Sequence, residues 1–264
     1  MSARIKKIFE KKTKKLITFT TGGDPKLSTS KKILKTIVDN NIDLIEIGMP
    51  FSDPMADGPT IQLSSNRAIK SNITLNEIFD LAYHVRLQNN YIPIILMGYY
   101  NVIFHFGLNN FVSKCKEFKI DGLIIVDLQP EEDEELINIL KENNIDLIRL
   151  VTPITNEQRL KSILTNASGF IYYVTVTGIT GQNSANMEEL KKSIKMIRKN
   201  SSLPIIAGFG IKNSNDVRNI CKYTDGVVVG SSIVKIIEEN INNENQLIEN
   251  IKIFTAELKK GTIK

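Results

Sequence analysis

The chain has 264 residues, of which 42% are hydrophobic and 24% are charged, and its formal net charge at pH 7 is +5. This composition is typical of a globular protein with a sizeable core and excludes a disordered chain. No apolar run approaches the roughly 20 residues that span a bilayer, and none follows the first residues as in a secretory signal. We therefore expect a cytoplasmic protein that does not enter a membrane.

Short apolar runs rich in isoleucine and valine recur along the chain, each followed by a longer amphipathic segment. The predicted strands are residues 16–20, 44–49, 92–97, 122–126, 147–151, 170–174, 204–207 and 226–229. Helical patterns between them cover residues 30–40, 75–88, 109–118, 131–143, 186–199 and 216–221. Eight buried strands that alternate with helices predict an α/β protein, a single (β/α)8 TIM barrel over residues 1–264. An extra N-terminal helix within residues 1–15 should cap the barrel floor, and an extra C-terminal helix near residues 244–258 should complete the outer ring.

The remaining composition signals favour no metal site and no nucleic-acid site. Cys115, Cys221 and the two histidines form no metal-ligand or redox motif. The lysines of residues 6–15 alternate with apolar residues and lack an aromatic stacking platform, which indicates a solvated helix face. The modest positive charge can still help to attract a phosphate ester.

A carboxylate interrupts the second predicted strand, at Glu46. Side chains alternate along a strand, so Glu46 shares a face with Leu44 and Gly48. A buried carboxylate is costly unless it is hydrogen-bonded or catalytic. We expect Glu46 to point inward near the catalytic mouth, partly desolvated and with a raised pKa. A structural glutamate bonded to a neighbouring strand is the alternative.

The loop after this strand, residues 51–60, contains two aspartates, two prolines and a glycine. Turn chemistry alone explains one aspartate and one proline. The combination Asp57-Gly58-Pro59 predicts a carboxylate at a sharp bend above the barrel mouth, where active sites of this architecture lie. A solvated turn is the alternative for Asp57 alone.

Glycines follow the seventh and eighth predicted strands, in residues 208–211 and at Gly230, ahead of Ser231 and Ser232. Glycines let backbone N–H groups approach an anion, and a helix N-terminus adds a favourable dipole. Barrels of this class frequently bind phosphate at these two loops. A third glycine segment, residues 178–181, is typical of a mobile lid.

The stretch EIGMPFSDPMADGPTIQ at residues 46–62 resembles the signature of the tryptophan synthase alpha subunit family. Further matches run along nearly the whole chain: Phe19, GDP at 23–25, MGYYN at 97–101, Asp127, PEE at 130–132, VTGITG at 176–181 and GFGI at 208–211. The resemblance implies a TIM-barrel lyase that splits indole-3-glycerol phosphate into indole and glyceraldehyde 3-phosphate without a cofactor of its own.

The resemblance also assigns residues. It implies that Glu46 and Asp57 are the catalytic acid–base pair, with Asp57 at the indole N–H and Glu46 serving C3 of the ring and the glycerol hydroxyl. The substrate-binding positions that it implies are Phe19 and Met97 around the indole, Tyr172 as a positioning residue, Thr180 orienting Asp57, and Gly181, Gly210, Gly230 and Ser231 around the phosphate.

A partner follows from the same resemblance: a beta subunit that carries pyridoxal phosphate and receives indole, in an α2β2 heterotetramer. The implied interface positions are Asp53, Tyr99, Asn101 and Phe104. Two positions depart from the family pattern. Gln129 stands where relatives often have proline, which predicts a less rigid loop there, and Val176 stands where many have arginine.

Other functions stay open at this stage. The glycine loops also suit an isomerase or synthase acting on a sugar phosphate or an anthranilate-derived phosphate, or a flavin-binding barrel, although the spacing of Glu46 and Asp57 and the lack of an inward lysine favour the lyase. A third possibility is a chain that acts mainly as a partner-binding subunit and activates another enzyme.

Overall fold

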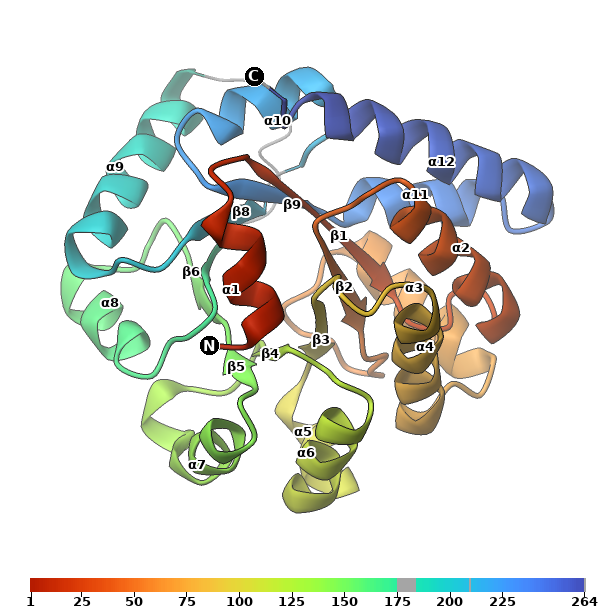
Figure 1. The fold of residues 1–264 in the computed structure, drawn as a ribbon, viewed down its shortest axis with the longest axis horizontal. Helices are drawn as coiled ribbons and strands as arrows, with labels where there is room; N and C mark the ends of the chain where they lie inside the picture. The colour runs from red at the N-terminus through yellow and green to blue at the C-terminus, as the bar shows by residue number, and fades with distance from the viewer. Residues whose placement is uncertain (175–183, 209, 264) are drawn as a thin grey trace.

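The computed structural model describes residues 1–174, 184–208 and 210–263. All strands of this part of the chain pair in parallel, in the order β5-β4-β3-β2-β1-β9-β8-β7-β6, and Figure 1 shows them as a ring surrounded by helices. Their bounds are β1 Lys15–Thr21, β2 Leu44–Gly48, β3 Ile94–Gly98, β4 Gly122–Ile125, β5 Asp146–Leu147, β6 Arg149–Val151, β7 Ile171–Val174, β8 Ile205–Gly208 and β9 Gly226–Val229.

β5 and β6, which stand at the two ends of that order, are consecutive pieces of one strand. β5 and β6 are separated by Ile148 alone, whose backbone N–H donates to the Leu123 carbonyl of β4 at 2.9 Å. β5 pairs with β4, and β6 pairs with β7. The sheet therefore closes through this interrupted strand, and the predicted barrel of eight strand positions is confirmed.

Helices cover the outside of the ring (Figure 1). In the described residues they are α1 Ala3–Glu10, α2 Leu27–Asp39, α3 Pro59–Lys70, α4 Leu75–Gln88, α5 Tyr100–Phe106, α6 Leu108–Glu117, the 3-10 turn η1 Pro130–Glu132, α7 Glu134–Glu142, α8 Glu157–Leu164, α9 Ser184–Asn200, α10 Ser214–Cys221, α11 Ser231–Glu239 and α12 Glu244–Lys260. The predicted extra helices are α1 and α12. None of the helices within the described ranges has the length and apolar character that crossing a bilayer requires.

Alternation along the strands creates two apolar layers. One fills the barrel interior and includes Leu44 of β2, and α1 closes its lower end with Ile5. The other lies between the sheet and the helices and includes Ile45 and Ile47. The predicted side-chain directions on β2 are thus confirmed, and Glu46 belongs to the inner set because it alternates with Ile45 and Ile47.

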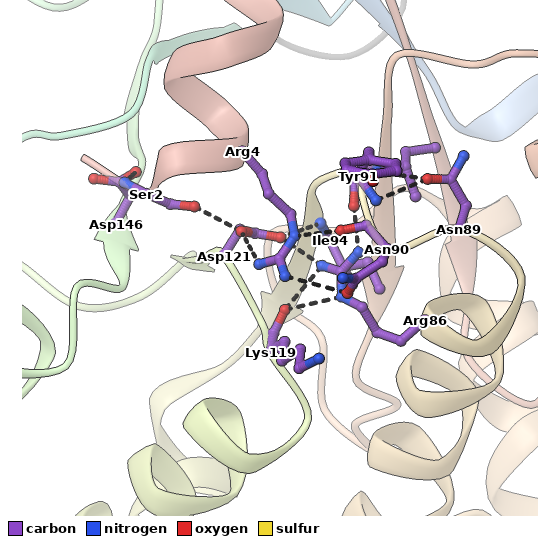
Figure 2. A network of polar contacts seen from close by, with 11 residues as sticks. Ser2, Arg4, Arg86, Asn89, Asn90, Tyr91, Ile94, Lys119, Asp121 and Asp146 are labelled. Atoms are coloured by element: carbon purple, nitrogen blue, oxygen red, sulfur yellow. Dashed lines mark hydrogen bonds and ion pairs between the residues drawn. The ribbon is translucent and has the colours of Figure 1, made fainter.

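Buried charges at the barrel floor form the polar network of Figure 2. The Asp121 carboxylate accepts hydrogen bonds from Ser2 Oγ at 2.6 Å, Arg86 Nη2 at 2.6 Å and the Ile94 N–H at 2.9 Å. The Ser2 N–H donates to Asp146 at 2.7 Å. These aspartates lie at the amino ends of β4 and β5, opposite the βα loops. In this fold that end serves stability, so the network explains these charges without a catalytic role.

Candidate active site

Glu46 lies at the centre of the barrel interior. It pairs in register with Phe19 of β1 and Ile95 of β3, and its side chain is 0% exposed. Neither carboxylate oxygen has a hydrogen-bond partner within the described part of the chain. Burial without compensation disfavours the charged form and raises the pKa of Glu46 to about 8. The direction agrees with the sequence prediction, but the burial is complete where partial desolvation was expected.

Tyr172 of β7 shares this interior with Glu46. Its side chain is buried, and burial together with the charge of Glu46 raises its pKa well above the ordinary value. The neighbouring strand makes room for the ring, because a Cβ atom at Gly208 would lie 2.7 Å from Tyr172 Cε1. A glycine is therefore needed at position 208 because the Tyr172 ring lies so close to its backbone. The sequence suggested only that the loop of residues 208–211 contacts an anion.

We expect Gly208→Ala to destabilise the protein by about 1–3 kcal/mol, the usual cost of overpacking. In a Tyr172→Ala background the same change should cost little, because the added methyl group then enters vacated space. Urea unfolding of the wild type, the two single variants and the double variant measures the difference between the two costs. Equal costs in the two backgrounds would contradict the assigned contact.

A small cavity opens above this interior at the carboxyl ends of the first four strands. Gly48 connects the two levels, because it follows Glu46 on the same face of β2 and lines the cavity, whereas Glu46 itself does not. A Cβ atom at Gly48 would lie 2.6 Å from the Phe19 ring. The lining is apolar apart from three hydroxyls and one carboxylate: Phe19, Thr21, Gly48, Met49, Asp57, Ile61, Ser65, Met97, Gly98, Tyr99 and Val126.

Asp57 supplies that carboxylate from the loop between β2 and α3. Its backbone N–H donates to the Pro54 carbonyl at 3.0 Å, which closes a turn, and α3 begins two residues later at Pro59. Burial raises the pKa of the Asp57 carboxyl, and a hydrogen bond from the Tyr99 side chain opposes that effect. Asp57 is half-buried, so the alternative of a freely solvated turn residue does not describe it.

The two glycine loops expected to bind phosphate are adjacent. β8 and β9 pair in parallel, and Ser232 Oγ donates to the Ile211 carbonyl at 2.6 Å, which joins the loop containing Gly210 to the start of α11. Gly230 precedes that helix, and Ser231 is its exposed first residue. These loops can offer backbone N–H groups and a helix N-terminus to an anion. Thr180 and Gly181, the remaining predicted substrate positions, lie outside the described residues, as does Val176.

Comparisons with known proteins agree with this geometry. A family model described as "Tryptophan synthase alpha chain" matches residues 5–263. The chain belongs to the tryptophan synthase alpha chain family. It is 43% identical to the tryptophan synthase alpha chain of Petrotoga mobilis over 97% of this chain and 99% of that one, and 45% identical to that of Geotalea uraniireducens over 94% and 92%. The structure of tryptophan synthase subunit alpha from Legionella pneumophila superposes with a TM-score of 0.91 at 30% identity, over 99% and 98% of the two chains.

The residues predicted to contact a tryptophan synthase beta subunit divide into two groups. Asp53, Asn101 and Phe104 are exposed around the barrel mouth, and Phe104 is 65% exposed. Tyr99, in contrast, is 3% exposed and lines the cavity. Its side chain packs inside its own chain and leaves little surface for a partner, so its assignment to the interface stays a prediction.

Side chains hold the loop around Gln129, the residue that the resemblance marked as a departure. The Gln129 side chain accepts a hydrogen bond from Arg159 of α8. The neighbouring Leu128 carbonyl accepts one from Arg149 Nη1 at 3.1 Å, and Arg149 also pairs with the buried Asp133. These contacts tie the loop to β6 and α8; the lower rigidity expected from the missing proline stays a prediction.

Sequence reasoning missed several residues that line the cavity. Ile61 and Ser65 are one helical turn apart on α3, a helix that was not predicted, although proline at a first helical position after Gly58 is a helix-start signal. Tyr99 directly follows the glycine that ends β3, a position that already predicts the barrel mouth.

Proposed function

We propose that this chain cleaves indole-3-glycerol phosphate into indole and glyceraldehyde 3-phosphate, with Glu46 and Asp57 as its acid–base pair. The observation that supports the assignment of residues is the buried Glu46, whose carboxylate has no hydrogen-bond partner among the described residues. It lies on the inner face of β2, beneath a cavity to which Asp57 contributes the carboxylate. Membership of the tryptophan synthase alpha chain family supports the reaction itself.

The chemistry of this cleavage requires a proton donor near C3 of the indole ring. The bond between C3 and the glycerol carbon breaks readily once C3 is protonated, because its electron pair then restores the aromatic ring. With a pKa of about 8, Glu46 is mostly protonated at pH 7 and can donate this proton. The glycerol hydroxyl loses its proton as the C–O bond becomes a carbonyl, and Glu46 can accept it. The proton balance closes within the site, and no electrons are lost or gained.

Asp57 has a different task, because positive charge develops on the ring nitrogen when C3 is protonated. An anionic carboxylate near the N–H stabilises that charge in the transition state. Apolar side chains, Phe19 and Met97 among them, line the small cavity around Asp57, and such side chains are the usual partners of an aromatic ring. We propose that Tyr172 helps to position the substrate, and that Gly181, Gly210, Gly230 and Ser231 hold its phosphate while Thr180 orients Asp57.

An alpha chain of tryptophan synthase has a beta-subunit partner. We propose that the complex is an α2β2 heterotetramer in the cytoplasm, that pyridoxal phosphate resides in the beta subunit, and that indole passes to it from the barrel mouth. Asp53, Asn101 and Phe104 lie in the segments that follow β2 and β3 at the mouth, and they are our candidates for the interface. Met55, in the loop that carries Asp57, is 85% exposed and gives this surface further apolar area.

Indole release from indole-3-glycerol phosphate tests the proposal. We expect slow release by the isolated chain and at least tenfold faster release when a beta subunit is added. Acceleration of the beta subunit's own reaction without any indole release would instead identify a partner-binding activator. No indole release with or without the beta subunit would reject the proposed reaction and return attention to other phosphate esters.

A further inference from the structure

We propose that Tyr99 is a positioning residue, which clamps the loop between β2 and α3 and holds the Asp57 carboxylate over the cavity. This inference rests on the proposed function of Asp57. It concerns a residue that follows a different strand, β3, and whose side chain is buried in its own chain.

Tyr99 contacts the loop at two points. Its ring stacks on Phe51 at the loop's beginning, with 5.1 Å between ring centroids and 29° between ring planes. Its hydroxyl accepts a hydrogen bond from the Ala56 N–H at 3.1 Å, next to Asp57. Tyr99 follows the last residue of β3, so a rigid strand end anchors both contacts.

The hydroxyl can serve both neighbours because a phenol donates one hydrogen bond and also accepts. It accepts from the Ala56 N–H, and the Asp57 carboxylate raises the pKa of Tyr99 both by its charge and by hydrogen bonding. Burial raises the pKa of Tyr99, and the nearby charges of Asp57 and Asp127 raise it further. The phenol therefore keeps its proton throughout the working pH range and remains a donor.

Among residues 1–174, 184–208 and 210–263, the other polar contacts of the loop are local. The Met55 N–H donates to the Asp53 carbonyl at 2.9 Å, and Gln62 Nε2 of α3 donates to the Asp57 carbonyl at 2.9 Å. Neither contact reaches the Asp57 carboxylate. The Tyr99 hydroxyl holds the backbone N–H next to Asp57, and hydrogen bonding between the two side chains affects the pKa of both. Because Tyr99 stands at the end of β3, it can fix the loop from outside the loop itself.

The substitution Tyr99→Phe tests the clamp because it keeps the stacked ring and removes the hydroxyl. We expect kcat for indole release to fall about ten- to a hundredfold, the range for a lost hydrogen bond to a charged group, with KM changed less than threefold. The hydroxyl opposes the raised pKa of Asp57, so its loss should move the acidic limb of the pH profile to higher pH. Tyr83→Phe, on the outer face of α4, is the matched control.

Two further measurements separate this inference from its premises. In an Asp57→Asn background, Tyr99→Phe should cost less than threefold in kcat, and a full additional loss would show that Tyr99 acts independently of Asp57. Hydrogen exchange of residues 51–58 should accelerate at least tenfold in Tyr99→Phe and not in Tyr83→Phe. Unchanged hydrogen exchange in Tyr99→Phe would overturn the clamp, whether or not the wild-type chain releases indole. Missing indole release in the wild type would reject the proposed function but not the clamp.

Discussion

Glu46→Gln and Asp57→Asn are each expected to lower the turnover of indole-3-glycerol phosphate by about 10²–10⁴-fold, the contribution of a general acid or base. Each change keeps the size of the side chain. Glutamine cannot give a proton to C3 or take one from the glycerol hydroxyl, and asparagine carries no negative charge to face the ring nitrogen. Steady-state indole release, together with binding of the substrate measured by calorimetry, separates lost chemistry from lost binding, and we expect binding to remain measurable.

The control for these two variants is Asp39→Asn, which removes an exposed carboxylate of α2 that pairs with Lys35 on the outer surface. Its turnover should equal that of the wild type. Turnover within threefold of the wild type in either active-site variant would refute the assigned pair. The wild-type rate should also fall as the pH rises through about 8, because Glu46 must hold its proton to begin the reaction.

The stability of the same Glu46→Gln variant relative to the wild type is expected to rise by about 4 kcal/mol between pH 4.5 and pH 8. The folded protein keeps the Glu46 proton up to about pH 8, whereas the unfolded chain releases it near the ordinary pKa of 4.5. Between these values the folded state binds more protons than the unfolded state, so wild-type stability falls as the pH rises. A glutamine has no such proton to lose.

Urea unfolding of both proteins at pH 5 and pH 8 measures this effect. All other titrating groups are common to the two proteins, so the change in their stability difference between the two pH values isolates Glu46. Any constant cost of burying the amide is the same at both pH values and cancels. A stability difference that does not change with pH would mean that Glu46 is ionised in the folded protein, contrary to its burial.

Glu46 thus has opposite effects in the two predictions: the substitution that removes activity also removes the loss of stability that Glu46 causes as the pH rises. An unpaired buried carboxylate lowers stability at neutral pH, and proteins retain such groups mainly where function requires them. The floor of the barrel provides the contrast, because there Asp121 is also buried but accepts hydrogen bonds from Ser2, Arg86 and Ile94.

The features of this protein that depend on the periodicity of its side chains could be predicted from the sequence alone. Alternation along a strand predicted that Glu46 faces inward with Leu44, and burial on that face predicted the direction of its pKa. The recurrence of apolar runs predicted eight strand positions, and the loop composition singled out Asp57. These features follow from residues adjacent in the chain, because side-chain direction in a strand is set by the backbone itself.

Tertiary structure decided the contacts between segments that are distant in the chain. Tyr99 and Ala56 are 43 positions apart, and whether that tyrosine faces the cavity or a partner depends on how the loop after β2 packs against the end of β3. The room that Gly208 leaves for Tyr172, and the complete burial of Glu46, likewise depend on barrel closure and on the mutual approach of neighbouring strands. No periodicity encodes those approaches, because they result from packing between elements rather than from the conformation of any single one.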